Sequence, residues 1–210
     1  MDCSKVGDLL YRLRREKNLT QKQVADQLNI SDKTVSKWER GLGCPDVSLL
    51  GELSGLFEVN IEKILAGDLE ANGIETGNLR HIKFYVCPTC ANVISTTGHA
   101  EISCCGRKLT PLQAKPADDG HAATVEDTDD AYYITFAHEM TKAHYLTFVA
   151  FVANDKMFFV KLYPEQEASV ILPKTVSGKW LHKYGRTLYY CCGKHGLYTL
   201  STPALVTEKR

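Results

Sequence analysis

The chain has 210 residues with 25 basic and 25 acidic side chains, so its formal net charge is zero. Net charge therefore excludes bulk attraction to nucleic acid, and any DNA binding must come from a local basic surface. The hydrophobic fraction of 44% is sufficient for a buried core, and the length is typical of one or two domains.

The start of the chain is heavily charged and lacks the apolar segment of a signal peptide. The longest apolar-rich run, residues 145–154, is too short to span a bilayer. We therefore expect a cytoplasmic protein with no membrane partner. In that compartment, eight cysteines are more typical of metal ligands or redox groups than of a disulfide framework. Cys3 and Cys44 belong to no motif, and we expect both to be ordinary thiols.

Residues 1–66 are predicted to form five short helices. Apolar residues recur with the helical period from Val6 to Leu13. Side chains that cap helix starts, and a glycine that suits the position after a helix, mark most of the boundaries. These boundary residues are the caps Thr20, Ser31 and Asn60, the terminator Gly41, and the pair Pro45–Asp46 that opens the fourth helix.

The stretch LTQKQVADQLNISDKTVSKWERG contains two of these helices and the turn between them. It resembles the helix-turn-helix of the Cro and phage-repressor (XRE-like) family, and the resemblance extends over residues 5–66. Ala25 is small where the two helices would cross, and Ile30 and Val35 are expected to face inward. The resemblance implies binding to double-stranded DNA as a two-fold homodimer on paired half-sites.

The third predicted helix exposes polar side chains, as a recognition helix does. Such a helix reads base edges with its N-terminal residues and holds phosphates with its flanks. Asp32 at its start would repel phosphate, so a five-helix bundle for protein contacts, with a merely solvated charged face, is the alternative. The expected DNA contacts are Lys33, Thr34 and Lys37 in the groove, and Gln21 and Arg40 on the backbone.

The short segment 82–110 contains two pairs of cysteines at loop distance from one another. The turn within the first pair aims both sulfurs at one point, and Gly106 helps the adjacent second pair to do the same. The pattern predicts a tetrahedral four-thiolate site for iron or zinc, which supplies much of the segment's folding energy. Two redox disulfides are the alternative. The four residues are Cys87, Cys90, Cys104 and Cys105.

From Tyr132 onward the chain reads as short aromatic and β-branched strands, including YYITF, HYLTFVAFV, KMFFVKLY, ASVIL and TLYYCC. Five or more such strands predict an antiparallel β-sandwich. In the last of them, Cys191 and Cys192 must point to opposite faces because strand side chains alternate. We expect Cys191 to pack on the face that carries Tyr189.

The same region carries a scattered set of metal-binding side chains. His138 and His144 are six residues apart, so they can converge only if the chain turns back between them. Cys192 precedes His195 by three residues in CCGKHG, and His121 lies upstream. Four imidazoles and one thiolate exceed the four ligands of structural zinc. Five ligands leave one octahedral position open, which suits iron and a small reactant.

Residues 82–200 resemble desulfoferrodoxin, the two-centre superoxide reductase, over YVCPTC, ISCCGRKL, GHAATVE, HEMTKAHY, KLYPEQEASVIL and CCGKHGLY in the family's order. The resemblance implies one-electron reduction of superoxide to hydrogen peroxide at a mononuclear iron. It also implies a rubredoxin-like first centre and an electron-donor protein such as rubredoxin. The implied catalytic-iron ligands are the equatorial His121, His138, His144 and His195 and the axial Cys192.

The chain departs from that family beside the first histidine. Asp119 and Gly120 stand where the family has glutamate and lysine, so a positive charge is missing there. Glu139 replaces a common proline after the second histidine. Lys142 and Lys194 are candidates to replace the missing charge. We take Asp119 and Lys194 as the candidate catalytic residues.

The expected architecture is an α+β multidomain protein. One hypothesis makes it an oxidoreductase, a superoxide reductase carried on a DNA-binding module. Another makes it a transcriptional regulator whose iron centres sense oxidant with weak or no catalysis, and a third makes both metal sites structural. The expected parts are an all-α helix-turn-helix domain at 1–68, a linker at 69–81, a rubredoxin- or desulforedoxin-like metal ribbon at 82–115, and an immunoglobulin-like antiparallel β-sandwich with the iron site at 116–210.

Overall fold

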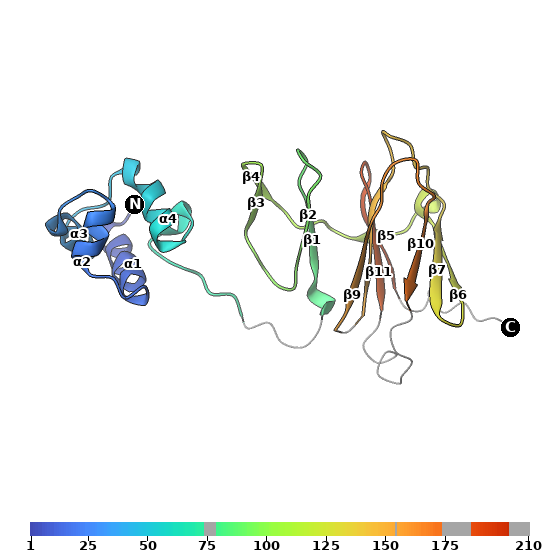
Figure 1. The fold of residues 1–210 in the computed structure, drawn as a ribbon, viewed down its shortest axis with the longest axis horizontal. Helices are drawn as coiled ribbons and strands as arrows, with labels where there is room; N and C mark the ends of the chain where they lie inside the picture. The colour runs from blue at the N-terminus through green and yellow to red at the C-terminus, as the bar shows by residue number, and fades with distance from the viewer. Residues whose placement is uncertain (74–78, 154, 174–185, 202–210) are drawn as a thin grey trace. The chain divides into compact units, whose positions relative to one another are not determined.

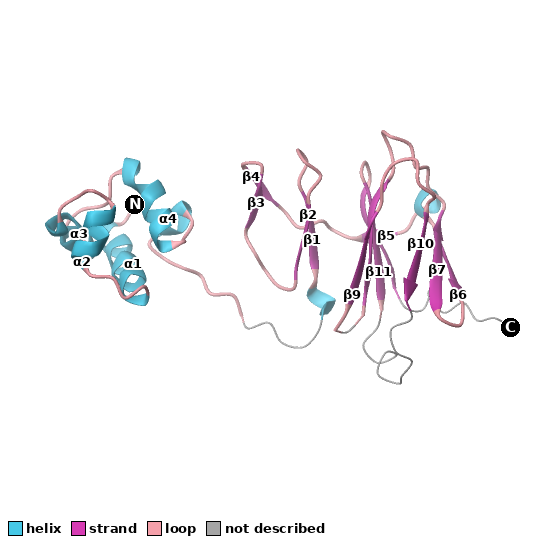
Figure 2. Cartoon of the chain, viewed as in Figure 1, coloured by secondary structure: helices cyan, strands magenta, loops and turns pink. Residues whose placement is uncertain are grey.

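The computed structural model describes residues 1–73, 79–153, 155–173 and 186–201 (Figure 1). The chain divides into two compact units, residues 1–73 and 74–210. Helices make up the first unit and strands dominate the second, which confirms the predicted α+β architecture (Figure 2). Residues 74–78 of the predicted linker lie outside the described residues. Of the helices in the described ranges, none has the length and apolar character needed to cross a membrane.

The first unit contains the five predicted helices. Thr20 and Gln23 form a reciprocal capping box at the second helix, and the Ser31 side chain caps the third. The fourth begins with a 3-10 turn that the Asp46 side chain caps. Asn60 stands at the N-cap of the fifth without a side-chain bond. The elements are α1 (Cys3–Glu16), α2 (Gln21–Gln27), α3 (Asp32–Glu39), η1 (Val47–Leu49), α4 (Leu50–Phe57) and α5 (Ile61–Ala66).

A single apolar core joins these helices. Ala25 and Val35 are buried and Ile30 is partly buried, in line with the sequence analysis. Helix α1 crosses α3 closely, since a Cβ on Gly7 would lie 2.0 Å from the Trp38 carbonyl oxygen. Only glycine allows that approach, so this residue sets how α1 rests on the predicted recognition helix.

Cys3 and Cys44 form a disulfide, so the expectation of two ordinary thiols was wrong. Cys3 is the first residue of α1, and Cys44 lies between α3 and η1. Their Cα atoms are 4.9 Å apart although 41 positions separate them in sequence. Only the packing of α1 against the end of α3 brings them together, which a local motif cannot reveal.

The second unit begins with a ribbon of two β-hairpins. The first pairs β1 (Lys83–Val86) with β2 (Val93–Thr96), after the 3-10 turn η2 (Leu79–His81). The second pairs β3 (Ile102–Cys104) with β4 (Arg107–Leu109). Each hairpin therefore holds one cysteine pair at its turn.

Two sheets follow, with strand orders β10-β7-β6 and β5-β12-β11-β8-β9. All pairings are antiparallel except that of β5 with β12. The antiparallel sandwich is thus observed, and its immunoglobulin-like character stays a prediction. The bounds are β5 (Lys115–Pro116), η3 (Asp119–His121), β6 (Ala123–Asp127), β7 (Ala131–Phe136), β8 (Leu146–Val152), β9 (Met157–Lys161), β10 (Ser169–Pro173), β11 (Thr187–Cys192) and β12 (Gly196–Ser201).

The centre of the five-stranded sheet is buried on both faces. One face packs with the three-stranded sheet around residues such as Ile134 and Tyr190. The other face carries Phe148 and Cys191, which pack with Phe84 of the ribbon. Strand β8 is consequently buried at every position, which explains why its sequence is an apolar run and not an alternating pattern.

Candidate metal centres and DNA-contact surface

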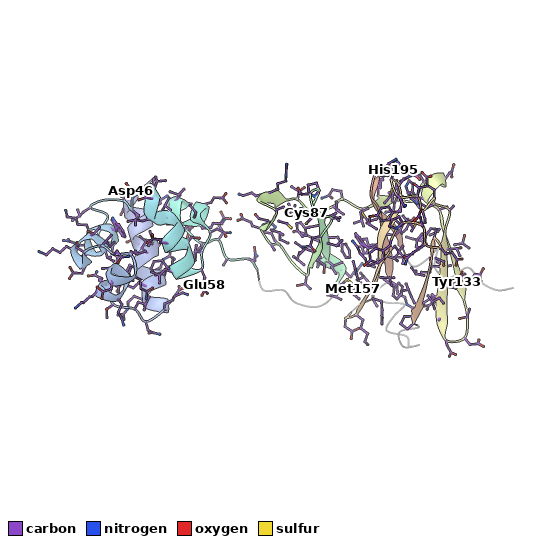
Figure 3. The ribbon with its side chains drawn as sticks, turned by 45° about the horizontal axis from the view of Figure 1, so that its top comes forward. Asp46, Glu58, Cys87, Tyr133, Met157 and His195 are labelled. Atoms are coloured by element: carbon purple, nitrogen blue, oxygen red, sulfur yellow. A yellow bond between two sulfur atoms is a disulfide. The ribbon has the colours of Figure 1, made fainter. Side chains whose placement is uncertain are left out.

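Five metal-binding side chains gather on the loops at one end of the sandwich. His121 ends η3, and His138 and His144 lie in the loop between β7 and β8. Cys192 ends β11, and His195 lies in the turn to β12 (labelled in Figure 3). One donor atom from each lies within 4.8 Å of all the others. The structure therefore brings together all five predicted iron ligands.

Local turns produce this convergence. The chain reverses between His138 and His144, where the Thr141 N–H donates to the His144 carbonyl at 2.9 Å. The pairing of β11 with β8 shifts register between Cys191 and Cys192. The result is that the thiol of Cys192 contacts His144 Nε2 at 3.1 Å and His195 Nδ1 at 3.6 Å.

Hydrogen bonds fix which imidazole nitrogen points inward. His121 Nδ1 donates to Asp118 Oδ1 at 2.5 Å. His144 Nδ1 bonds to the Glu139 carboxylate, and His138 Nδ1 bonds to the Glu139 carbonyl oxygen. With Nδ1 engaged, each of these three rings turns Nε2 toward the centre. Metal-binding histidines use their second nitrogen in this way.

The centre of the cluster has the properties of a cation site. His138 Nε2 is buried and has no hydrogen-bond partner among the described residues, although such atoms are rare in folded proteins. His121 Nε2 and His195 Nδ1 face each other at 3.1 Å. Desolvation lowers the pKa of His138 and of His195, so both rings favour the neutral form that can bind a metal. A metal ion would satisfy these converging donors, so the residues present fit one.

A second layer of side chains supports His121. The Tyr198 ring stacks on it with centroids 4.1 Å apart, and the Tyr198 hydroxyl donates to Asp118 Oδ2 at 3.1 Å. The Tyr190 hydroxyl donates to the His121 carbonyl oxygen at 2.6 Å. The bond with His121 is the main reason why the pKa of Asp118 lies below its usual value. Lys115 lies 4.6 Å from the centroid of the Tyr198 ring.

The supporting residues differ from those expected from the sequence. Asp119 is exposed, and the carboxylate that contacts His121 belongs to the preceding residue, Asp118. Lys194 is exposed, and its backbone N–H points to the Cys192 sulfur at 3.4 Å. Lys142 pairs with Glu165 at 3.7 Å. The aspartate three residues before His121 was visible in the sequence, whereas the approach of Lys115 depends on the pairing of β5 with β12.

The four cysteines of the ribbon form the second cluster, with one sulfur of each within 4.8 Å of the others (Cys87 is labelled in Figure 3). All four are free thiols in the structure, not disulfides. Cys105 and Gly106 form the β3–β4 turn with φ of 50° and 73°. This left-handed pair of conformations turns both adjacent sulfurs toward the first hairpin.

The thiols of this cluster differ in proton affinity. Hydrogen bonding from the Cys90 backbone lowers the pKa of Cys87 to about 6. Hydrogen bonds with the other sulfurs, first with Cys90, raise the pKa of Cys105 to about 12. Metals bind the thiolate form, so metal uptake at neutral pH must release the proton that Cys105 holds.

The predicted DNA contacts occupy α3 and its surroundings. Lys33 and Lys37 are exposed on α3. The Thr34 hydroxyl bonds to Ser31 Oγ at 2.9 Å within the helix cap. Arg40 folds back, with Nε donating to the Ser36 carbonyl oxygen at 3.1 Å.

Gln21 has a structural partner inside the unit. Its side-chain amide donates to Glu39 Oε2 at 2.8 Å. The buried Arg14 donates to both oxygens of the same carboxylate, at 2.6 and 2.9 Å. These bonds hold α1, α2 and α3 together, so Gln21 helps to fix the arrangement that presents Lys33 and Lys37.

Residues 10–64 match the family model HTH_3, helix-turn-helix. The HTH-type transcriptional activator BcrR of Enterococcus faecalis is 42% identical over 77 residues, which are 37% of this chain and 38% of BcrR. Desulfoferrodoxin of Syntrophotalea carbinolica is 24% identical over 126 residues, which are 56% of this chain and 94% of that protein. The superoxide reductase of Treponema pallidum gives a TM-score of 0.49 with 18% identity, over 58% of this chain and 98% of its own.

The chain thus spans just over a third of BcrR and nearly all of the desulfoferrodoxin. The helix-turn-helix model and BcrR agree with the first resemblance drawn from the sequence, and the desulfoferrodoxin match agrees with the second. The chain thus joins a helix-turn-helix region to a superoxide reductase-like region that carries a histidine–cysteine cluster.

Proposed function

We propose that this DNA-binding protein reduces superoxide to hydrogen peroxide at a mononuclear iron in the sandwich loops. The observation that carries the proposal is the convergence of five donor atoms around the buried, unpartnered Nε2 of His138. Structural zinc closes with four ligands, so a five-donor set favours an iron that keeps one position for a small reactant. The proposed ligands are His121, His138, His144, Cys192 and His195.

Iron bound in this cluster would supply the single electron that converts superoxide, with two protons, to hydrogen peroxide. Asp118 and Glu139 bond to the Nδ1 atoms of two of the rings, which fixes the ring orientation and directs their Nε2 atoms inward. His195 is exposed, so the cluster is open to solvent on its side. Water can therefore deliver the protons there.

Lysines near the cluster supply the positive charge that attracts an anion. The Lys115 charge acts on both Asp118 and His195, and the Lys194 charge acts on Glu139. Lys142 is engaged with Glu165. We propose that Lys115 and Lys194 together replace the lysine that the family carries next to its first histidine.

The four-cysteine ribbon is proposed to hold a second metal, iron or zinc. Its sulfurs form the four-donor set that both metals accept in tetrahedral geometry. An electron-donor protein such as rubredoxin, a homodimeric state on DNA, and the domain boundaries at 68, 81 and 115 belong to the same proposal.

A second candidate function is regulation, in which the iron centre senses oxidant and catalysis is weak. The helix-turn-helix match at residues 10–64 favours a regulatory function, because a helix-turn-helix binds DNA and has no part in reducing superoxide. Kinetic measurements distinguish the reductase from the sensor. Catalytic turnover with a continuous electron supply supports the reductase, whereas a single oxidation that changes DNA affinity supports the sensor.

The test combines metal analysis of the purified full-length protein with superoxide consumption under electron supply. We expect one iron in the five-donor site and a second iron or a zinc in the ribbon, with multiple turnovers per chain. Protein that carries both metals but consumes superoxide no faster than the metal-free chain would overturn the proposed catalysis.

A further inference from the structure

The disulfide between Cys3 and Cys44 lies in the helix-turn-helix unit, in a different compact unit from both metal clusters. Both residues are half-buried and so lie outside the fully buried core of that unit. A DNA-binding protein works in a compartment where thiols are kept reduced, and disulfides that form there are usually transient or redox-sensing. A bonded pair in this position therefore needs an oxidant to form it and a reductant to open it.

The bridge joins two elements that contact the recognition helix. Cys3 occupies the first turn of α1, whose Gly7 lies against the Trp38 carbonyl of α3. Cys44 follows Gly41, where the chain leaves α3 with a φ of 69° and where a Cβ would lie 3.0 Å from Ser4 Cα. The oxidised pair therefore ties the start of α1 to the loop that follows α3.

We propose that Cys3 and Cys44 form a redox-modification site that peroxide oxidises reversibly, and that the bridge stabilises the DNA-reading unit. One thiolate attacks a peroxide oxygen, the O–O bond breaks, and a sulfenic acid forms with release of one water. The second thiol attacks that sulfur, the S–S bond forms, and a second water leaves. The two sulfurs lose two electrons, and hydrogen peroxide is reduced to two waters.

The site stands independently of the metal chemistry, because the oxidant can be peroxide from any source. The expected physical effect follows from the 41-residue separation of the two cysteines. A crosslink between distant positions restricts the unfolded chain and so favours the folded unit. Peroxide would then raise the stability of the part of the chain that binds DNA, and reducing thiols would lower it.

Peptide mapping tests the bond directly in the full-length, metal-loaded protein. The reduced protein is treated with hydrogen peroxide, its free thiols are alkylated, and trypsin releases Cys3 in residues 1–5 and Cys44 in residues 41–63, neither of which has another cysteine. We expect these two peptides to become linked by peroxide and to separate again after dithiothreitol. Free alkylated cysteines in both peptides, or links to other peptides, would overturn the proposal.

Thermal unfolding followed by helical circular dichroism tests the consequence, since the helices lie in the first unit. Peroxide should raise the midpoint of the helical transition by about 10 °C or more, as expected for a crosslink of this span. The variants Cys3→Ser and Cys44→Ser should show no such shift. An equal shift in either variant, or none in the natural protein once the linked peptides have formed, would contradict the stabilising role.

Discussion

Two adjacent aspartates, Asp118 and Asp119, precede the first histidine of the candidate iron site, and only one of them contacts it. Both are exposed, but Asp118 bonds to His121 at 2.5 Å and accepts from Tyr198. The sequence could not separate them because both stand in a polar connection before the histidine. The family comparison pointed to Asp119 by its place in the motif, and the 3-10 turn of η3 brings Asp118 to the ring instead.

This difference gives a matched pair of variants. Asp118→Asn keeps the shape of the side chain but removes the charge that orients and polarises His121. Losing such a partner lowers metal affinity by about 10- to 100-fold. Competition with a chelator should show that loss for Asp118→Asn and none for Asp119→Asn. Equal affinities in the two variants would mean that the contact at His121 does not support the metal.

Lys115 offers a second test at the level of one side chain. Its charge acts on His195 and Asp118, so Lys115→Met should weaken the attraction of superoxide. We expect the second-order rate constant to fall several-fold and to depend less on ionic strength. Lys142→Met is the control, since Lys142 already pairs with Glu165. If both variants retained the natural rate and salt dependence, Lys115 would have no role in attracting the anion.

Among the helices and strands, the sequence predicts those that have a local signal. Capping residues and periodic apolar positions locate the helices, and aromatic runs locate β7 to β11. The weakly apolar β6, the two-residue β5 and the strand β12 beyond CCGKHG were missed. The full burial of β8 comes from packing with Phe84 of the ribbon, a contact between distant segments.

The disulfide also depends on contacts between distant segments, which the sequence does not reveal. Nothing near Cys3 or Cys44 signals a partner, and the bond depends on how α1 crosses α3. The convergence of the five metal-binding residues was predictable, by contrast, because the family motifs and the need for a turn between His138 and His144 pointed to it. Geometry that depends on several elements at once is what sequence reasoning misses here.

A prediction about the ribbon concerns its four-cysteine cluster and the β3–β4 hairpin. Cys104→Ser removes one of four sulfurs, so the ribbon should lose its metal and its second hairpin should loosen. Strand β1 should stay protected from hydrogen exchange, because Phe84 packs with Phe148 and Cys191 of the five-stranded sheet. Hydrogen exchange should rise in β3 and β4 while β1 and the five-donor site remain unchanged. A full complement of both metals in the variant would contradict the four-thiolate site.

A further prediction concerns the expected recognition helix, α3. Replacing Lys33 and Thr34 by alanine should abolish sequence-selective DNA binding, since each good base contact contributes about 1–3 kcal/mol. Thr34 also bonds to Ser31 in the helix cap, so circular dichroism must show that the double variant stays folded. Gel-shift selectivity that survives in a folded double variant would remove these two residues from the interface.

The chain combines a helix-turn-helix unit and a unit with two clusters of metal-binding side chains, and its formal net charge is zero. Neither function depends on bulk electrostatics: the first needs a local helix surface and the second a local donor cluster. The proposed function would place a reaction that consumes an oxidant on the same chain as a DNA-reading helix. A redox-active pair, Cys3 and Cys44, lies within the helix-turn-helix unit.

We propose that Cys192, and not its neighbour Cys191, binds an iron that reduces superoxide. Cys192 contacts His144 and His195, whereas Cys191 packs on the opposite face, where burial raises its pKa to about 11. Oxidised iron bound to a thiolate gives a visible sulfur-to-iron charge-transfer band. The measurement is the spectrum and superoxide consumption of Cys192→Ser and Cys191→Ser. We predict that Cys192→Ser loses the band and most activity while Cys191→Ser keeps both, and the reverse pattern would contradict the assignment.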